Sequence, residues 1–287
     1  MSSPALLRLW RGAAPVLLDA VLPPLCLGCN EIVGTPGCLC PACWTKLDFV
    51  APPCCVRCAR PFARAPGPAA LCTACSARPP RWRRARAALV YDGRSRQLVL
   101  PFKHGDRTDM ARACGRWMAR AGADLLAGSD LVAPVPLHWR RLFLRRYNQA
   151  QLLARMALAA APPGGARLVP VPLHWTRLVA RRFNQAAELT RHLSARTGLA
   201  NEALLLKRVR RTRHQVGLTR AQRLENVTGA FRIAADRRGW VRGKRLVLVD
   251  DVLTTGATVE ACAIALQRGG AAAVDVLTLA RVVRPAV

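Results

Sequence analysis

Apolar and polar positions follow three different patterns along this chain. The first stretch is apolar but interrupted by charges, as in an amphipathic helix that packs on a following domain. The second is crowded with Cys, Pro and Gly, so it cannot bury enough apolar surface to fold alone. In the third, apolar runs alternate with helical stretches, which favours a parallel sheet covered by helices. We therefore expect a helix at 1–23, a small Cys-rich domain at 24–80 and an α/β domain at 86–287.

Three apolar runs in the last of these parts predict strands. They cover Ala87–Tyr91, Leu131–Pro136 and Leu246–Val249. Helical stretches fill the interval up to about Leu126. Between two of them, Lys103 and His104 mark a basic turn, which we interpret as a helix-capping turn.

The last apolar run continues directly into two acids and a Thr/Gly segment, D-D-V-L-T-T-G-A-T. In open α/β sheets, ligands bind just past the carboxyl end of such a strand. A helix that begins near Gly256 would present free backbone N–H groups and a partial positive charge, which suit a phosphate. The Thr hydroxyls add donors, and the two carboxylates can accept from ribose hydroxyls or hold Mg²⁺ indirectly. The predicted site for a metal-bound sugar phosphate consists of Asp250, Asp251, Thr254, Thr255, Gly256, Ala257 and Thr258.

A strand-loop-helix unit occurs twice in the α/β part. P-V-P-L-H-W-R-R-L-F-L-R-R-Y-N-Q-A returns 36 residues later as P-V-P-L-H-W-T-R-L-V-A-R-R-F-N-Q-A, and 15 of 23 positions are identical between residues 133–155 and 169–191. This identity indicates a tandem duplication, and two copies are too few for a solenoid. In each copy an Arg-rich loop leads to a helix that opens near Asn148 or Asn184. Arginine on such a loop can bind phosphate oxygens through two parallel hydrogen bonds.

The sheet has room for one copy at this position. The second copy leads into the phosphate-binding strand with no extra unit between them, so we expect it to be the functional one. The first copy would then loop out or pack on an edge. The alternative is that the first copy is the functional one, because it follows directly on Leu131, where a single unit would begin. The residues expected to face a pyrophosphate are Arg181, Arg182, Asn184 and Gln185.

Residues 210–231 are polar and basic, with few apolar anchors before Val227. They predict a mobile loop that closes over a charged ligand and excludes water. A disordered basic connector is the alternative. The loop residues that we single out are Thr212, Gln215, Arg223 and Asn226.

Twelve Cys are present, and ten of them lie between Cys26 and Cys75. Eight form four C-x-x-C pairs, whose spacing lets two thiolates reach one ion, so that two pairs complete a tetrahedral shell. This spacing favours two structural zinc ions over a disulfide framework, and the metal would supply much of the folding free energy. We expect sequential ribbons at 26–43 and 55–75, with crossed pairing as the alternative. The predicted zinc ligands are Cys26, Cys29, Cys40, Cys43, Cys55, Cys58, Cys72 and Cys75.

The four other Cys have different expected roles. Cys38 and Cys54 would lie beside the zinc sites, as neighbours or alternative ligands. Cys114 and Cys262 fall in helical patterns and are expected to be core thiols. Zinc ribbons of this kind either bind nucleic acid or protein or only anchor a domain, and the sequence leaves both roles open.

The formal net charge of +29 favours contact with nucleic acid. Only four of the 45 basic residues are Lys, a bias typical of a GC-rich genome, but such a bias does not supply the excess charge. Part of this charge lies in residues 76–88, a basic link with an exposed-looking Trp82. Arginine beside an aromatic side chain suits phosphates and stacked bases. A solvated linker is the simpler interpretation of this segment.

No apolar run reaches the roughly 18 residues that a membrane-spanning helix needs. Asp19 interrupts the N-terminal apolar stretch and no small-x-small cleavage site follows, which argues against a signal peptide. We therefore expect a cytoplasmic protein without a transmembrane segment, with membrane-surface contact of the N-terminal helix as the alternative.

The motifs, taken in order, resemble the ComF family, zinc-ribbon phosphoribosyltransferase-like proteins linked with DNA uptake in competence. They are the four C-x-x-C pairs, P-V-P-L-H with R-R-F-N-Q-A, R-x-T-x-x-Q-x-x-L with R-L-E-N-V-x-x-A-F, and D-D-V-L-T-T-G-A-T. The last motif is similar to the phosphoribosyl pyrophosphate (PRPP) motif of type I phosphoribosyltransferases. The resemblance covers nearly the whole chain from residue 24. The chain departs from the family in its duplicated unit, and in having Arg146 and Arg182 where many members have Gly.

The resemblance implies a type I phosphoribosyltransferase fold, a parallel sheet behind a double zinc ribbon. Asp250 and Asp251 would face the ribose of PRPP, and Thr254–Thr258 its 5′-phosphate. One implied function is an enzyme that binds PRPP with Mg²⁺ and transfers phosphoribosyl to an unknown nitrogen acceptor, with Asp251 the better candidate for a base. The other is a non-catalytic accessory protein that binds single-stranded DNA or another competence protein and is regulated by PRPP.

Overall fold

The computed structural model describes residues 23–64, 66–67, 69–104, 107–136, 148–161, 167–168, 205–210, 219–233, 235 and 238–283. The chain divides into two units, Met1–Leu47 and Asp48–Val287. The expected helix at 1–23 lies outside the described residues except for its last position, and the second copy at 169–191 lies outside them entirely.

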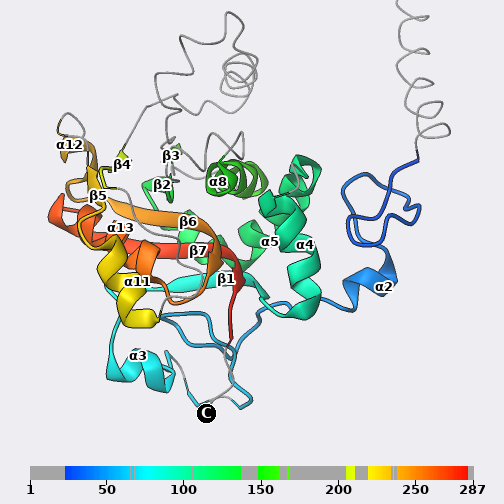
Figure 1. The fold of residues 1–287 in the computed structure, drawn as a ribbon, viewed down its shortest axis with the longest axis horizontal. Helices are drawn as coiled ribbons and strands as arrows, with labels where there is room; N and C mark the ends of the chain where they lie inside the picture. Colours follow the sequence, from blue (N-terminus) through cyan, green and yellow to red (C-terminus); the bar gives the residue numbers. More distant parts are fainter. Residues whose placement is uncertain are drawn as a thin grey trace, which may run out of the picture. The chain divides into compact units, whose positions relative to one another are not determined.

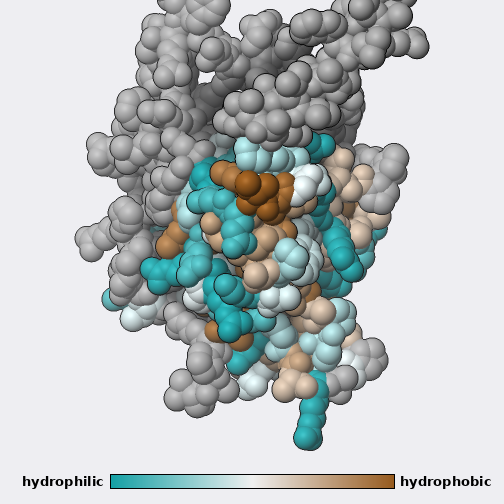
Figure 2. Space-filling model, turned by 90° about the vertical axis from the view of Figure 1, so that its right-hand side faces the viewer, coloured by the Kyte–Doolittle hydropathy of each residue, from teal (hydrophilic) through white to brown (hydrophobic). Residues whose placement is uncertain are grey.

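Within the first unit, the described residues form a ribbon around four Cys. Leu25 and Ile32 make an antiparallel bridge at its base, and the short helix α2 (Pro41–Trp44) begins directly after Cys40. Three large apolar side chains of this ribbon are exposed, Leu25 by 48%, Ile32 by 71% and Trp44 by 45%. Figure 2 shows one face of the molecule, on which brown hydrophobic residues lie among teal hydrophilic ones.

The second unit is built on a five-stranded sheet in the order β1-β7-β6-β2-β3. Every neighbouring pair in this sheet is parallel. A separate antiparallel pair joins β4 to β5. The strands are β1 (Ala85–Val90), β2 (Leu131–Pro134), β3 (Arg167–Leu168), β4 (Leu206–Arg208), β5 (Phe231–Ile233), β6 (Arg245–Leu253) and β7 (Ala273–Arg281).

Helices cover both faces of this sheet (Figure 1). One face carries α13, with α11 and the β4–β5 pair packed beside it, and the other carries α5 and α8. Both layers agree with the predicted α/β class. The helices of this unit are α3 (Thr73–Ala77), α4 (Gly93–His104), η1 (Thr108–Met110), α5 (Ala111–Ala121), α6 (Ala123–Ala127), α8 (Gln149–Ala160), α11 (Arg220–Val227), α12 (Arg238–Val241) and α13 (Ala257–Arg268).

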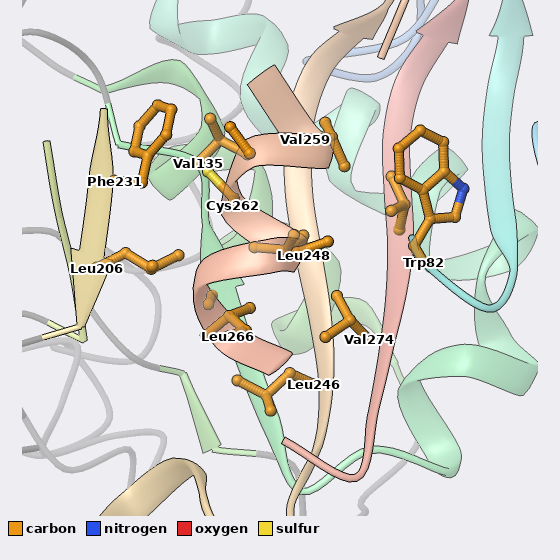
Figure 3. Packing of buried hydrophobic residues seen from close by; sticks show 14 of the residues in the cluster. Trp82, Val135, Leu206, Phe231, Leu246, Leu248, Val259, Cys262, Leu266 and Val274 are labelled. Carbon is orange, nitrogen blue, oxygen red and sulfur yellow. The ribbon is translucent and has the colours of Figure 1, made fainter. Parts of the chain in front are cut away.

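The apolar run of β6 is continuous because both faces of the strand are buried. Leu246 and Leu248 point toward Cys262 and Leu266 of α13 (Figure 3). Val247, which lies between them in the strand, points to the opposite face of the sheet, which α8 covers. On that face α5 and α8 approach closely at Gly115, where an added Cβ would lie 2.2 Å from the Cβ of Met156.

The strand boundaries differ from the sequence prediction mainly at β6. The apolar run suggested an end at Val249, but β6 continues to Leu253 because its pairing with β7 continues to that residue. The predicted basic turn at Lys103 and His104 is wrong, since both residues belong to α4.

The basic segment 76–88 is not a solvated linker, and its Trp82 is not exposed. Trp82 is only 4% exposed and belongs to the core cluster of the second unit. The guanidinium of Arg83 donates two hydrogen bonds, of 3.0 and 2.6 Å, to the buried carboxylate of Asp275 in β7. The sequence pattern did not predict the contact with Asp275, because this residue lies almost two hundred residues downstream.

The first copy of the duplicated unit lies inside the sheet. Its strand β2 pairs with β6 in parallel, from Leu131 opposite Leu246 to Pro134 opposite Val249. Its helix α8 packs on α5 and β6. The expectation that the first copy loops out or packs on an edge is therefore wrong, because its strand is the direct neighbour of β6.

Candidate functional site

The carboxyl end of β6 projects beyond its neighbour β2. The ladder between these strands ends where the N–H of Val135 donates to the carbonyl of Val249 at 2.8 Å. The ladder between β6 and β7 continues to Leu253, opposite Arg281. The resulting step in the sheet is where open α/β proteins bind ligands.

The two predicted acids lie at this step, within the projecting part of β6. Both are half-buried. The Asp250 Oδ1 accepts the N–H of Asp251 at 2.9 Å, and the Asp251 Oδ1 accepts the N–H of Val252 at 2.7 Å. Each carboxylate therefore has one oxygen engaged with the backbone of the strand. Carboxylate oxygens also suit ribose hydroxyls and Mg²⁺.

The turn after β6 contains the predicted phosphate-binding residues. Thr254 is exposed, Thr255 is half-buried, and Gly256 is the N-cap of α13 with a φ of 80°. A glycine cap has no side-chain acceptor for the first-turn N–H groups, which together with the helix dipole favour an anion. The Oγ1 of Thr255 lies 3.5 Å from the N–H of Ala257. These residues can thus present amides and hydroxyls to a phosphate.

A cavity of about 380 Å³ adjoins this turn. The cavity is lined by Thr254, Thr255 and Gly256 of the turn, by residues of the second zinc ribbon, among them Arg60, and by Arg78 just after it. Arg281 of β7 also lines the cavity, and its Nη1 donates to the carbonyls of Leu253 at 2.8 Å and Thr254 at 2.5 Å. Sequence reasoning missed Arg281, because no motif surrounds it at the end of its strand.

The first copy shows what the Asn shared by both copies of the duplicated unit does within the fold. Asn148 is 5% exposed and is the N-cap of α8. Its Oδ1 accepts from the N–H groups of Ala150 at 3.0 Å and Gln151 at 3.4 Å. This side chain therefore stabilises the helix start. The pyrophosphate residues predicted in the second copy, Arg181, Arg182, Asn184 and Gln185, lie outside the described residues.

The predicted mobile loop is only partly described. Thr212 and Gln215 lie outside the described residues, whereas Arg223 and Asn226 belong to α11. The guanidinium of Arg210 donates to the carbonyls of Asn226 at 3.0 Å and Thr228 at 2.8 Å. Arg210 is thus hydrogen-bonded to the backbone at the carboxyl end of α11.

The eight Cys of the four C-x-x-C pairs form two sets, grouped sequentially. Within each set the four Sγ atoms lie within 4.8 Å of one another. The Sγ atoms of Cys29 and Cys40 are 3.6 Å apart, as are those of Cys58 and Cys72. Zinc–sulfur bonds of about 2.3 Å in a tetrahedron place sulfurs about 3.8 Å apart. Both sets therefore fit zinc, and none of the twelve Cys forms a disulfide.

Hydrogen bonds already favour one thiolate in each set. Burial opposes the ionisation of Cys26, but N–H donors, the one from Cys40 foremost, outweigh it and lower the pKa of this thiol to about 6. In the second set, hydrogen bonds from Cys58 and Cys75 lower the pKa of Cys55. Because the thiol of Cys58 donates this hydrogen bond to Cys55, its own pKa is raised to about 11. A divalent cation would ionise the remaining thiols.

The remaining Cys lie outside both sets. Cys38 is half-buried, and Cys54 forms a backbone bridge with Pro61. Cys114 and Cys262 are fully buried in α5 and α13, as core thiols should be. Burial raises the pKa of Cys114 to about 12.

Zinc analysis of protein purified without chelators should return two ions per chain. Replacing Cys40 by Ser removes one ligand from the first set and should lower the content to one ion. The matched change Cys38→Ser should keep both ions, because Cys38 is outside the set. A metal content near zero, with disulfides detected by mass spectrometry, would contradict both zinc sites.

Within the described part of the chain, no helix combines the length and the apolar character needed to cross a bilayer.

Comparisons with known proteins agree with this architecture. The double zinc ribbon domain family matches residues 17–82. DNA utilization protein YhgH of Salmonella typhimurium is 32% identical over 233 residues, covering 79% of this chain and 83% of that protein. The protein of the same name from Escherichia coli K12 is 29% identical over 263 residues, 90% of each chain. Competence protein F of Haemophilus influenzae is 36% identical over 189 residues, 64% of this chain and 66% of that protein.

Proposed function

Because this chain belongs to the ComF family, we propose that it binds PRPP with Mg²⁺ at the carboxyl end of β6 and acts in DNA uptake. The names of its relatives, which refer to DNA utilization and competence, support the second part. The first part is supported by the site itself. The two zinc ribbons and the parallel sheet also fit a phosphoribosyltransferase-like protein.

The single observation that carries the PRPP proposal is the step between β6 and β2. Two half-buried carboxylates lie there, two residues before a Thr/Gly turn and the start of a 12-residue helix. Carboxylates suit the ribose hydroxyls, and the helix start suits the 5′-phosphate. A ribose with phosphate groups at both C5 and C1 would contact both features at once.

The chemistry proposed for this site is transfer of phosphoribosyl to a nitrogen acceptor. The bond between C1 and the pyrophosphate oxygen breaks, pyrophosphate leaves with its electron pair, and the acceptor nitrogen forms the new bond to C1 and loses a proton. Magnesium on the pyrophosphate neutralises its developing charge when bound. In this proposal Asp250 and Asp251 hold the ribose and stabilise the cationic C1, and Asp251 accepts the proton.

PRPP consumption and pyrophosphate release, measured with a panel of free bases and with single-stranded DNA, test this reaction. Release that depends on one acceptor supports the transferase. PRPP binding without turnover under any of these conditions would reduce the proposal to a PRPP-binding protein. Absence of binding in calorimetry would overturn the PRPP site altogether.

The second candidate function is a DNA-handling accessory for which PRPP is only a regulator. The net charge of +29 favours it, together with the names of the relatives. Binding of single-stranded DNA through phosphate contacts should weaken steeply as salt rises. Tight binding to single strands that PRPP alters without being consumed would favour this function over the transferase.

A further inference from the structure

We propose that the second zinc ribbon positions the phosphate-binding turn, and that Trp82 is the residue through which its zinc site does so. This inference rests on the proposed PRPP site. The second ribbon, Cys55 to Cys75, lines the same cavity as the turn after β6. Trp82 is a positioning residue in this scheme and does not itself contact the ligand.

The zinc knuckle of the second ribbon holds Trp82 at two points. Arg57 lies between the ligands Cys55 and Cys58, so its backbone is fixed when both thiolates bind one ion. The Nε1 of Trp82 donates to the carbonyl of Arg57 at 2.5 Å. The Nη1 of Arg57 donates in return to the carbonyl of Trp82 at 2.7 Å. Backbone and side chain of Trp82 are therefore both tied to the knuckle.

Trp82 in turn packs directly on the phosphate-binding turn. A Cβ added to Gly256 would lie 2.6 Å from the Cη2 of the indole. The turn can approach this closely only because Gly256 has no side chain, and its φ of 80° also favours glycine. The indole therefore forms the support behind the residue that begins α13.

The segment around Trp82 is also joined to α13 itself. The N–H of Arg81 donates to the Glu260 Oε2 at 3.0 Å, and the Nε2 of Gln267 donates to the carbonyl of Arg81 at 2.6 Å. On the ribbon side, the N–H of Ala85 donates to the carbonyl of Val56, next to Arg57, at 3.0 Å. The segment is thus held between the knuckle and the helix whose start would bind the phosphate.

The first ribbon lacks the residue that makes this link. Its equivalent knuckle, Cys26–Cys29, has Gly28 at the position that Arg57 occupies in the second. An added Cβ at Gly28 would lie 2.9 Å from the Sγ of Cys43. The first knuckle therefore has neither a guanidinium nor room for one in this conformation.

The expected consequence is that the second zinc ion controls affinity for the 5′-phosphate. Without this ion the carbonyl of Arg57 is no longer fixed, Trp82 loses its anchor and the turn loses its support. A misplacement of about 1 Å at such a site can cost up to about a hundredfold in function. Pyrophosphate bound alone would contact other residues, so its affinity should be independent of this support.

The test measures binding of PRPP, ribose 5-phosphate and pyrophosphate to the full chain by calorimetry, with zinc content and circular dichroism recorded for each variant. Cys75→Ser should reduce the zinc content to one ion and weaken binding of PRPP and ribose 5-phosphate about tenfold or more.

Arg57→Gly and Trp82→Phe leave all eight zinc ligands in place. They should keep two ions and still weaken both ribose phosphates several-fold, with pyrophosphate unchanged. The matched control Trp44→Phe, in the first ribbon, should stay within about twofold of the parent.

Each outcome bears on a different claim. If the parent protein binds no PRPP, the proposed function fails. A second outcome concerns Trp82. Suppose that the parent binds PRPP and that the variants Arg57→Gly and Trp82→Phe, folded and with two zinc ions each, bind ribose phosphates equally tightly. The positioning role of Trp82 is then wrong. Equal weakening of pyrophosphate and ribose phosphates would also overturn it, because it would indicate general disturbance of the domain.

Discussion

Replacing Asp250 and Asp251 together by Asn should weaken binding of PRPP with Mg²⁺ about a hundredfold or more and leave the fold intact. Hydrogen bonds to a charged group contribute about 1.5–3 kcal/mol each, and both carboxylates lose their charge. The fold survives because Asn keeps the Oδ1 that accepts the N–H of Asp251 at 2.9 Å and that of Val252 at 2.7 Å. Calorimetry measures the affinity, and circular dichroism and thermal unfolding check the fold.

Asp130→Asn is the matched control for this variant. The Oδ2 of Asp130 accepts the N–H of Arg245 at 2.8 Å, at the opposite end of β6. Its replacement removes one carboxylate near the same strand and should leave PRPP affinity within about twofold. An Asp250/Asp251 double variant that binds PRPP as tightly as the Asp130 variant does would sink the assignment of the ribose site.

Replacing Arg145 and Arg146 by Ala should weaken PRPP and pyrophosphate binding about a hundredfold or more. These residues belong to the copy whose strand β2 is paired with β6, and they precede the helix capped by Asn148. Two guanidinium–phosphate contacts at about 1.5–3 kcal/mol each correspond to a loss of about a hundredfold or more. Calorimetry with PRPP and with pyrophosphate alone measures this loss.

The equivalent pair in the second copy, Arg181 and Arg182, provides the control. The two pairs have the same residue types at an offset of 36 residues, so Arg181→Ala with Arg182→Ala removes the same charge. This variant should retain most of its pyrophosphate affinity. The opposite ranking of the two double variants would show that the second copy, despite the position of β2, provides the pyrophosphate contacts.

Features that depend on local spacing follow from the order of the amino acids alone. Two residues between Cys ligands define a knuckle wherever the chain folds, so the eight ligands and their sequential grouping were predictable. The same holds for β6 and α13, because an apolar run followed by two acids and a Thr/Gly segment is typical of a buried parallel strand that leads to a helix start. It also holds for the helix start at Asn148, since an Asn cap acts on amides two and three residues away.

Which distant residues meet at the site depends instead on how the folded chain packs. The two copies of the duplicated unit are almost equal in sequence, so local pattern could not decide which strand would pair with β6; the sheet places the first one there. Trp82 and Arg281 have no motif around them, yet one supports Gly256 and the other holds the carbonyls of Leu253 and Thr254. Such contacts depend on the packing of a zinc knuckle, a strand end and a helix start. Periodicity and spacing report only on residues close together along the chain, and these three elements are far apart in it.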